Sequence, residues 1–380
     1  MNKVRVLSIF GTRPEAIKMA PLIKELDNHP LIDSFVCVTA QHREMLDQVL
    51  EIFSIQPDFD LDIMQKRQNI TSITVRALEG LSGIMKKNNP DIVLVHGDTT
   101  TTFAGALAAF YNKISVGHVE AGLRTYDKYS PYPEEMNRVL TGHIAEVHFA
   151  PTIKNKNNLI KENIKDNIYV TGNTVIDAIK HTVRPNYVFK SPELRDIDFS
   201  NGRYVLMTAH RRENLGEPLK NICRAVKKLV TDFEDIHVIY PVHLNPAVRE
   251  IVNSILGDTD RIHLIEPINV QDMHNLIDRC YIVMTDSGGL QEEAPSLGKP
   301  VLVLRTETER PEAVHAGTVK LVGINEDDIY NIASELLSDR EKYVKMAKAV
   351  NPYGDGKASI RIVKAILHKF GMGDRPLDFI

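Results

Sequence analysis

The sequence has few cysteines, no long apolar segment and no excess of either charge. Cys37, Cys223 and Cys280 lie far apart among apolar neighbours, which favours buried free thiols over disulfides or thiolate metal ligands. No segment approaches the roughly 18 apolar residues of a membrane span, and the N-terminus lacks the apolar core of a signal peptide. We therefore expect a cytoplasmic protein with no membrane partner.

The charge balance excludes a further class of function. The chain has 46 Lys and Arg against 50 Asp and Glu, a net charge of −4, which argues against a general nucleic-acid or membrane-surface binder. Hydrophobic residues make up 43% of the chain and charged residues 25%, as in ordinary folded domains. At 380 residues we expect about two or three domains rather than a single core.

Strand and helix patterns alternate along most of the chain. Near-continuously apolar strands such as DIVLVHG are typical of a parallel sheet covered on both faces. The alternation lapses over residues 184–202, where we predict a linker. We expect an α/β protein of two doubly wound, Rossmann-like domains, 1–183 and 203–356, with a C-terminal helix at about 357–370 that could pack on the first domain. Ligands of such sheets bind beyond the carboxyl ends of the strands, so we expect a cleft between the two domains.

The stretch YIVMTDSGGLQEEAPSLGKPVLVLR, residues 281–305, has the form of a strand, a glycine turn, a helix and a second strand. Small residues at Ser287 and Gly288 let backbone N–H groups approach an anion at a helix start. Of the residues that follow, one of Gln291, Glu292 and Glu293 can reach back over a bound group while another faces solvent. We predict a phosphate site, and the alternative is a plain turn between strand and helix.

The first strand also ends in a glycine turn, Gly11-Thr12-Arg13. It matches neither a dinucleotide fingerprint nor a P-loop. Arg13 at a helix start suits bidentate phosphate binding, and Lys18, one turn further, suits a second anion or a sugar hydroxyl. The alternative is a pair of ordinary surface cations.

Three carboxylates follow later strands: Asp98 in HGDTTTT, Glu120 in HVEAGLR and Glu134 in YPEEMNR. Asp98 could instead cap a helix, and Glu134 could form an i,i+4 ion pair with Arg138. Acids gathered in one cleft have raised pKa values, which suits them for proton transfer. The histidines lack metal-ligand spacing, so we expect no metal and no other cofactor.

The second half of the chain offers further cations at strand ends. His210 in TAHRREN could donate to a leaving phosphate, the alternative being a packed histidine. Arg310 in ERPE repeats the Arg-Pro-Glu order of Arg13-Pro14-Glu15, and we expect it to approach the same cleft.

Six blocks in order along nearly the whole chain resemble the non-hydrolysing UDP-N-acetylglucosamine 2-epimerases: FGTRPEAIKMAPL, VHGDTTTT, HVEAGLRT, PYPEEMNR, TAHRREN and TDSGGLQEEAPSLGKPVL. The resemblance implies a two-domain fold of the glycosyltransferase B type and a homodimer. It also implies reversible conversion of UDP-GlcNAc to UDP-ManNAc, through loss and re-addition of UDP, which supplies ManNAc units for cell-surface polysaccharide.

The resemblance also implies a role for each candidate residue. The acidic catalytic group corresponds to Asp98, Glu120 and Glu134. Nucleotide, diphosphate and ribose contacts correspond to Arg13, His210, Ser287, Gly288 and Glu293, and contacts to the sugar and phosphates to Lys18, Arg138 and Arg310.

Some members of that family bind UDP-GlcNAc at a second, activating site. The corresponding positions are Gln41, Arg67, Arg211 and His243, although Glu44, where relatives often carry glutamine, would weaken such a site. The other readings are a retaining glycosyltransferase, a hydrolysing epimerase and a non-catalytic nucleotide-sugar sensor.

Overall fold

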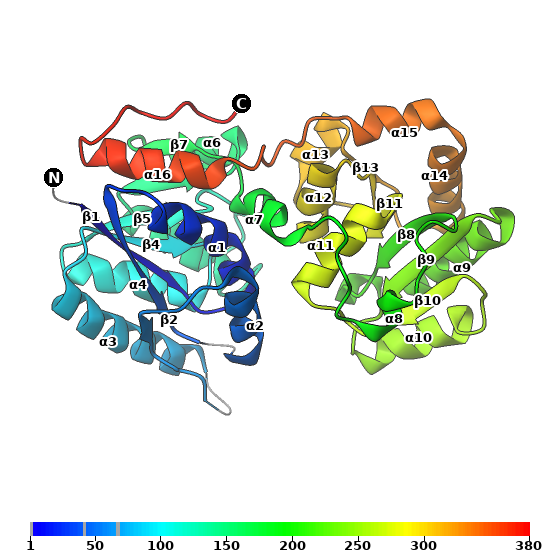
Figure 1. Ribbon diagram of the computed structural model, residues 1–380, viewed down its shortest axis with the longest axis horizontal. Coiled ribbons are helices and arrows are strands. Elements are labelled where there is room, and N and C mark those ends of the chain that lie inside the picture. Colours follow the sequence, from blue (N-terminus) through cyan, green and yellow to red (C-terminus); the bar gives the residue numbers. More distant parts are fainter. Residues whose placement is uncertain (1–2, 41–42, 66–68) are drawn as a thin grey trace. The chain divides into compact units, whose positions relative to one another are not determined.

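The computed structural model describes residues 3–40, 43–65 and 69–380 and contains two compact units (Figure 1). Unit 1 comprises Met1–His181 and Tyr353–Ile380, and unit 2 comprises Thr182–Pro352. Within the described ranges, no helix combines the length and the apolar character needed to cross a membrane.

Unit 1 is built on a seven-stranded parallel sheet with the order β3-β2-β1-β4-β5-β6-β7. Its strands are β1 (Val4–Phe10), β2 (Ile32–Val38), β3 (Phe59–Asp60), β4 (Ile92–His96), β5 (Ser115–Val119), β6 (Val147–Ala150) and β7 (Ile168–Val170). Its helices are α1 (Arg13–Asp27), α2 (Arg43–Phe53), α3 (Ile70–Asn88), α4 (Thr100–Tyr111), α5 (Glu134–Ile144), α6 (Ile153–Lys161), α7 (Thr174–Thr182) and α16 (Ala358–Lys369).

Unit 2 is built on a six-stranded parallel sheet with the order β10-β9-β8-β11-β12-β13. Its strands are β8 (Arg203–Thr208), β9 (Ile236–Pro241), β10 (Ile262–Ile265), β11 (Ile282–Thr285), β12 (Val301–Val303) and β13 (Val319–Leu321). Its helices are α8 (Pro192–Arg195), α9 (Glu217–Asp232), α10 (Pro246–Leu256), α11 (Val270–Arg279), α12 (Gly288–Glu293), α13 (Pro311–Ala316), α14 (Glu326–Ser338) and α15 (Arg340–Ala347), with 3-10 turns at Arg212–Asn214 and Ala294–Leu297.

The apolar strands explain why both faces of each sheet are covered. In β1, Val6 joins one buried cluster while Leu7 and Ile9 join another, because successive side chains of a strand point to opposite faces. Helices therefore pack on both sides of the sheet, as the alternation of elements predicted. A chain with two doubly wound, Rossmann-like units has the architecture of the glycosyltransferase B fold.

The segment expected to be a linker, 184–202, lies within unit 2. The backbone N–H groups of Lys190 and Ser191 donate to the buried Asp272 carboxylate at 2.9 Å each, and the Tyr187 hydroxyl donates to it at 2.7 Å. The C-terminal helix α16 lies against α1 in unit 1 (Figure 1). The boundaries of the units thus fall at 181/182 and 352/353.

Candidate functional site

The sheet order places a switch point in each unit. The direction in which successive strands are added reverses between β1 and β4 in unit 1, and between β8 and β11 in unit 2. Crossovers leave in opposite directions at such a point, so a crevice opens beyond the carboxyl ends of the two strands. Asp98, His210 and Ser287 lie in the loops after β4, β8 and β11, and Arg13 begins the helix after β1.

The loop after β1 is organised by Glu15, whose side chain is buried with 3% exposure. One carboxylate oxygen accepts from the N–H groups of Gly11 and Thr12 at 3.1 and 2.9 Å. The other accepts from the Thr99 hydroxyl at 2.8 Å. Burial raises the pKa of Glu15, and these hydrogen bonds oppose the rise. Glu15 therefore ties the turn that bears Arg13 to the residue that follows Asp98.

The sequence prediction overlooked Glu15 as a site-building residue. Its signal was present as a capping box, in which Thr12 precedes the helix and Glu15 is the third helical residue. The helix begins at Arg13, which places this guanidinium in its first turn.

Glu120 lies directly after β5, with a positive φ of 64°. Its carboxylate forms an ion pair with the Lys18 ammonium and accepts a 3.2 Å hydrogen bond from the Asn173 amide. His96 Nε2 is 3.6 Å from the same carboxylate oxygen. The structure therefore brings together Lys18 and Glu120, both predicted from the sequence, with two residues that were not.

Asp98 lies between Arg138 and Glu120. Arg138 Nη2 donates to the Asp98 carboxylate at 2.5 Å. Burial raises the pKa of Asp98, the Arg138 guanidinium lowers it, and the charge of Glu120 raises it. The pKa of Asp98 is raised overall, which is the direction that favours a general acid.

Arg138 pairs with Glu135, and not with Glu134, for which the sequence offered such an ion pair as an alternative. Arg138 Nη1 is 3.1 Å from Glu135, at i,i+3 spacing. Glu135 is buried with 2% exposure, and its other carboxylate oxygen is satisfied by the N–H groups of Thr125 and Tyr126, which donate to it. Glu134 is the first residue of α5 and is only partly buried. The charges that act on Asp98 come from Arg138, Glu120 and Lys18.

Two buried histidines lie in the strands that lead to these carboxylates, His96 in β4 and His118 in β5. Burial lowers the pKa of His96 to about 4 and that of His118 to about 3. His118 Nε2 lies 2.7 Å from the Gly97 carbonyl, in the loop that leads to Asp98. In the part of the chain that the structure describes, no cluster of three His, Cys, Asp or Glu side chains is arranged to hold a metal ion.

In unit 2 the buried Asp286 organises the loop after β8. One of its carboxylate oxygens accepts from the N–H groups of His210 and Arg211, each at 2.8 Å, and from the Asn214 amide at 3.0 Å. The His210 ring lies near the other oxygen, with 3.6 Å between Nδ1 and Oδ1. The predicted histidine is thus held beside the predicted phosphate turn.

Two arginines lie over the start of α12 at Gly288. A Cβ atom at this glycine would be 3.5 Å from the Arg310 guanidinium carbon and 3.8 Å from Arg211 Nη2. Ser287 directly precedes the helix. The backbone at a helix start and two guanidinium groups together make this corner attractive to an anion.

The polar residues of α12 lie differently from the sequence prediction, which placed one of them in solvent. Gln291 and Glu292 are buried. Gln291 accepts from the Thr308 hydroxyl at 2.6 Å, and Arg310 Nε donates to Glu292 at the same distance. Glu293 is partly buried, 3.5 Å from His274 Nε2. Of the two carboxylates of α12, Glu292 therefore pairs with Arg310 and positions its guanidinium. The ion pairs of the described residues give Glu293 a histidine neighbour and no arginine.

The residues of the predicted second site are only partly described. Gln41 and Arg67 lie outside the described residues, and Glu44 is exposed on α2. His243 stacks on His210 with ring centroids 5.1 Å apart and an interplanar angle of 4°. Arg211 Nη1 is 3.5 Å from Glu309. His243 and Arg211 therefore lie beside the phosphate corner of unit 2.

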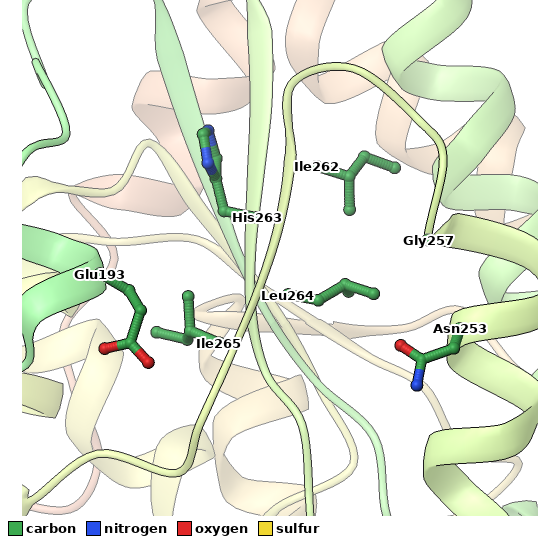
Figure 2. Close-up of a pocket in the computed structure, with 7 residues that line it drawn as sticks. All are labelled: Glu193, Asn253, Gly257, Ile262, His263, Leu264 and Ile265. Carbon is green, nitrogen blue, oxygen red and sulfur yellow. The ribbon is translucent and has the colours of Figure 1, made fainter.

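A separate cavity of about 420 Å³ lies at the edge strand β10. Figure 2 shows Glu193 of α8 and Asn253 of α10 on either side of this strand. Its remaining lining residues are Gly257, Ile262, His263, Leu264 and Ile265. The residues predicted from the sequence to act in catalysis or binding are absent from this lining.

Comparisons with known proteins agree over almost the full length. The family model described as UDP-N-acetylglucosamine 2-epimerase matches residues 24–367. The UDP-N-acetylglucosamine 2-epimerase of Bacillus subtilis is 60% identical and covers 98% of this chain, which covers 97% of that relative. A crystal structure of a UDP-N-acetylglucosamine 2-epimerase is 57% identical with a TM-score of 0.93, covering all of both chains. The Neisseria meningitidis UDP-GlcNAc 2-epimerase, solved bound to UDP-GlcNAc, is 51% identical with a TM-score of 0.84, covering 96% of this chain and 100% of that one.

Proposed function

The chain belongs to the UDP-N-acetylglucosamine 2-epimerase family, and we propose that it is an isomerase that interconverts UDP-GlcNAc and UDP-ManNAc. The observation that carries the proposal is the pair Asp98 and Glu120, which follow the neighbouring strands β4 and β5 and are each paired with a cation, Arg138 and Lys18 respectively. Carboxylates placed in this way can move a proton to and from a sugar carbon.

The chemistry requires more than deprotonation. The C2 hydrogen beside an acetamide nitrogen is not acidic, so the C1–O bond to UDP breaks first and leaves oxocarbenium character at C1. A carboxylate then removes the C2 proton, and the C2–H electron pair forms the C1–C2 double bond of 2-acetamidoglucal. Protonation of C2 from the opposite face and return of UDP to C1 complete the inversion.

Inversion at C2 uses acid and base groups on both faces of the sugar. Asp98 and Glu120 come from different loops and pair with different cations, so one could donate a proton while the other accepts one. We retain Glu134 as the third candidate. The position of Glu135 beside Arg138 makes it a support for that arginine.

The residues of unit 2 are proposed to hold the leaving group. Ser287, Gly288 and Arg310 would bind the diphosphate, with His210 as a further donor, and Glu293 would accept from the ribose hydroxyls. Arg13 of unit 1 would supply charge to the nucleotide. Fixed donors of this kind stabilise developing charge without reorganisation during the reaction.

We extend the proposal to the setting of the enzyme. It would act as a cytoplasmic homodimer without a cofactor, and its product would supply ManNAc units for cell-surface polysaccharide. UDP-GlcNAc bound near Gln41, Arg67, Arg211 and His243 would activate it.

The test is incubation with UDP-GlcNAc in D2O, followed by NMR at C2 and the anomeric carbon. We expect UDP-ManNAc with deuterium at C2. Free ManNAc would indicate a hydrolysing enzyme, a strict need for an acceptor would indicate a glycosyltransferase, and binding without exchange would indicate a sensor. For activation, the reaction of UDP-ManNAc is measured with and without traces of UDP-GlcNAc, and equal rates would exclude the second site.

A further inference from the structure

Asn173 links the loop after β7 to the carboxylate after β5. It is buried with 4% exposure, and its amide Nδ2 donates to Glu120 Oε2 at 3.2 Å. The strand order β5-β6-β7 puts both loops at the same edge of the sheet, because carboxyl ends of parallel strands align. The contact joins residues that are 53 positions apart in the chain.

The orientation of the Asn173 amide is fixed by a second hydrogen bond. Its Oδ1 accepts from the Val175 N–H at 3.1 Å, in the first turn of α7. Since the oxygen faces this backbone donor, the NH2 group faces Glu120. The loop itself is anchored, because the Asn173 N–H donates to the Tyr353 carbonyl at 2.6 Å.

We propose that Asn173 is a positioning residue for Glu120 in the epimerisation. The inference rests on the proposed function, which gives Glu120 its role. Glu120 is a non-glycine residue at positive φ, an uncommon backbone conformation that the surrounding contacts must hold in place. Lys18 attracts the carboxylate as a mobile point charge on a flexible stem, whereas the Asn173 amide, held at both ends, fixes the rotation of the carboxylate.

Other charged or titratable groups also surround Glu120, and the test must separate their effects. Lys18 of α1 pairs with it, and His96 of β4 lies 3.6 Å away. Asp98, in the loop after β4, interacts with it through its charge. A substitution at position 173 leaves these three groups in place.

Asn173→Asp is the most informative change. An aspartate is nearly isosteric and keeps the acceptor for the Val175 N–H, but it replaces a donor to Glu120 with a like charge. We expect the limb of the pH–rate profile that reports Glu120 to move upward by about one unit or more, and kcat at pH 7 to fall at least about tenfold with little change in KM. The serine hydroxyl of Asn173→Ser can still accept from the N–H groups at the start of α7, but it is too short to reach Glu120. This variant should lower kcat about tenfold without an upward shift of the pH–rate limb that reports Glu120.

The matched control is Asn269→Asp. Asn269 also precedes a helix, its Oδ1 accepts from the Asp272 N–H, and its Nδ2 donates to a carboxylate, that of Asp272, at 3.0 Å. The same chemical change is therefore made opposite an acid outside the proposed site. We expect a wild-type pH profile from it, whatever its effect on thermal unfolding.

Epimerisation is measured by NMR for all variants across pH. An upward shift in Asn173→Asp that Asn269→Asp lacks supports the inference. A wild-type profile in Asn173→Asp, or an equal shift in the control, overturns it. If Asn173→Asp does not fold, Asn173→Ser decides: wild-type kcat overturns the inference, and a lower kcat at constant KM supports it. An inactive wild-type protein would instead overturn the proposed function.

Discussion

The two switch points share a topology but differ in chemistry. In unit 1, Lys18 and Arg138 each face a carboxylate, Glu120 and Asp98. In unit 2, Arg310 and Arg211 lie over Gly288 at the start of α12. The first arrangement suits proton transfer and the second suits an anion. The same topology thus presents two different sets of charged groups, because the loops, and not the strand order at the switch point, differ between the units.

Both units have a buried acid that accepts hydrogen bonds from the backbone of a loop after a strand. In unit 1, Glu15 accepts hydrogen bonds from the backbone N–H groups of the loop after β1. In unit 2, Asp286 does the same for the loop after β8. Both carboxylates are buried, and each accepts hydrogen bonds from the backbone beside a candidate site residue, Arg13 in unit 1 and His210 in unit 2. A buried acid whose oxygens already accept from backbone N–H groups therefore has a structural role, because those oxygens hold the loop in place.

The largest expected effect tests the division of labour. Asp98→Asn and Glu120→Gln should each lower kcat at least about a hundredfold, because removing a general acid or base has that scale. UDP affinity, measured by calorimetry, should change little. Wild-type turnover in both variants would contradict the assignment. Comparing Glu134→Gln with Glu135→Gln under the same assay distinguishes a carboxylate that acts on substrate from one that supports Arg138.

The next effect tests the common scaffold. Glu15→Ala should lower the free energy of unfolding by about 2 kcal/mol or more, because the loop donors lose a buried acceptor, and should lower kcat as the loops separate. Denaturant titration and NMR turnover measure the two effects. Glu15→Gln keeps one acceptor oxygen and should therefore retain more of the stability and more of kcat than Glu15→Ala. Equal losses of stability and kcat in the two variants would contradict the role of the acceptor.

Glu15 also makes a pH-dependent contribution. Its pKa is raised above the ordinary value of 4.5, so its stabilising contribution is fully present below the unfolded-state pKa and is lost as pH rises through the folded-state value. The stability of the wild type relative to Glu15→Gln should therefore decline as pH rises above about 4.5. A rising difference, measured by thermal unfolding across pH, would be inconsistent with the raised pKa.

A smaller effect is expected from the cations of unit 2. Arg310→Ala should weaken UDP binding about tenfold or more, since hydrogen bonds to charged groups contribute about 1.5–3 kcal/mol. Calorimetry at constant salt measures the change. Arg249→Ala, which removes an arginine paired with Glu266 on the surface, is the control and should bind UDP as the wild type does. Equal affinities of the two variants would place Arg310 outside the nucleotide site.

The smallest effect is expected from the thiols. Burial raises the pKa of Cys37, Cys223 and Cys280 to about 12, so each stays protonated and unreactive near neutral pH. Iodoacetamide should leave the native enzyme unmodified and fully active, and should alkylate it only after denaturation. Rapid loss of activity with labelling of one thiol would contradict the burial.

The fold could be predicted from the sequence because it follows from local pattern. Apolar strands predicted the doubly wound sheets, which the structure confirms, and turns at strand ends provided Arg13, Asp98, Glu120, His210 and Ser287 as candidates. The sequence offered an i,i+4 ion pair between Glu134 and Arg138 as an alternative, and the structure pairs Arg138 with Glu135 at i,i+3, because helix spacing allows both partners. The choice of Glu135 depends on the N–H groups of Thr125 and Tyr126, which lie in another part of the chain.

The sequence by itself therefore determined the class of fold, the loops that follow the strands and the residue types that they present, since periodicity and turn residues act over a few positions. Tertiary structure alone decided which acids accept hydrogen bonds from backbone N–H groups of these loops and which lie beside cations. Glu15 and Asp286 became supports, Glu292 became the partner of Arg310, and Asn173 became the neighbour of Glu120. Most of these contacts join loops far apart in the chain, and hydrogen bonds of that kind are set by which strand ends the sheet aligns.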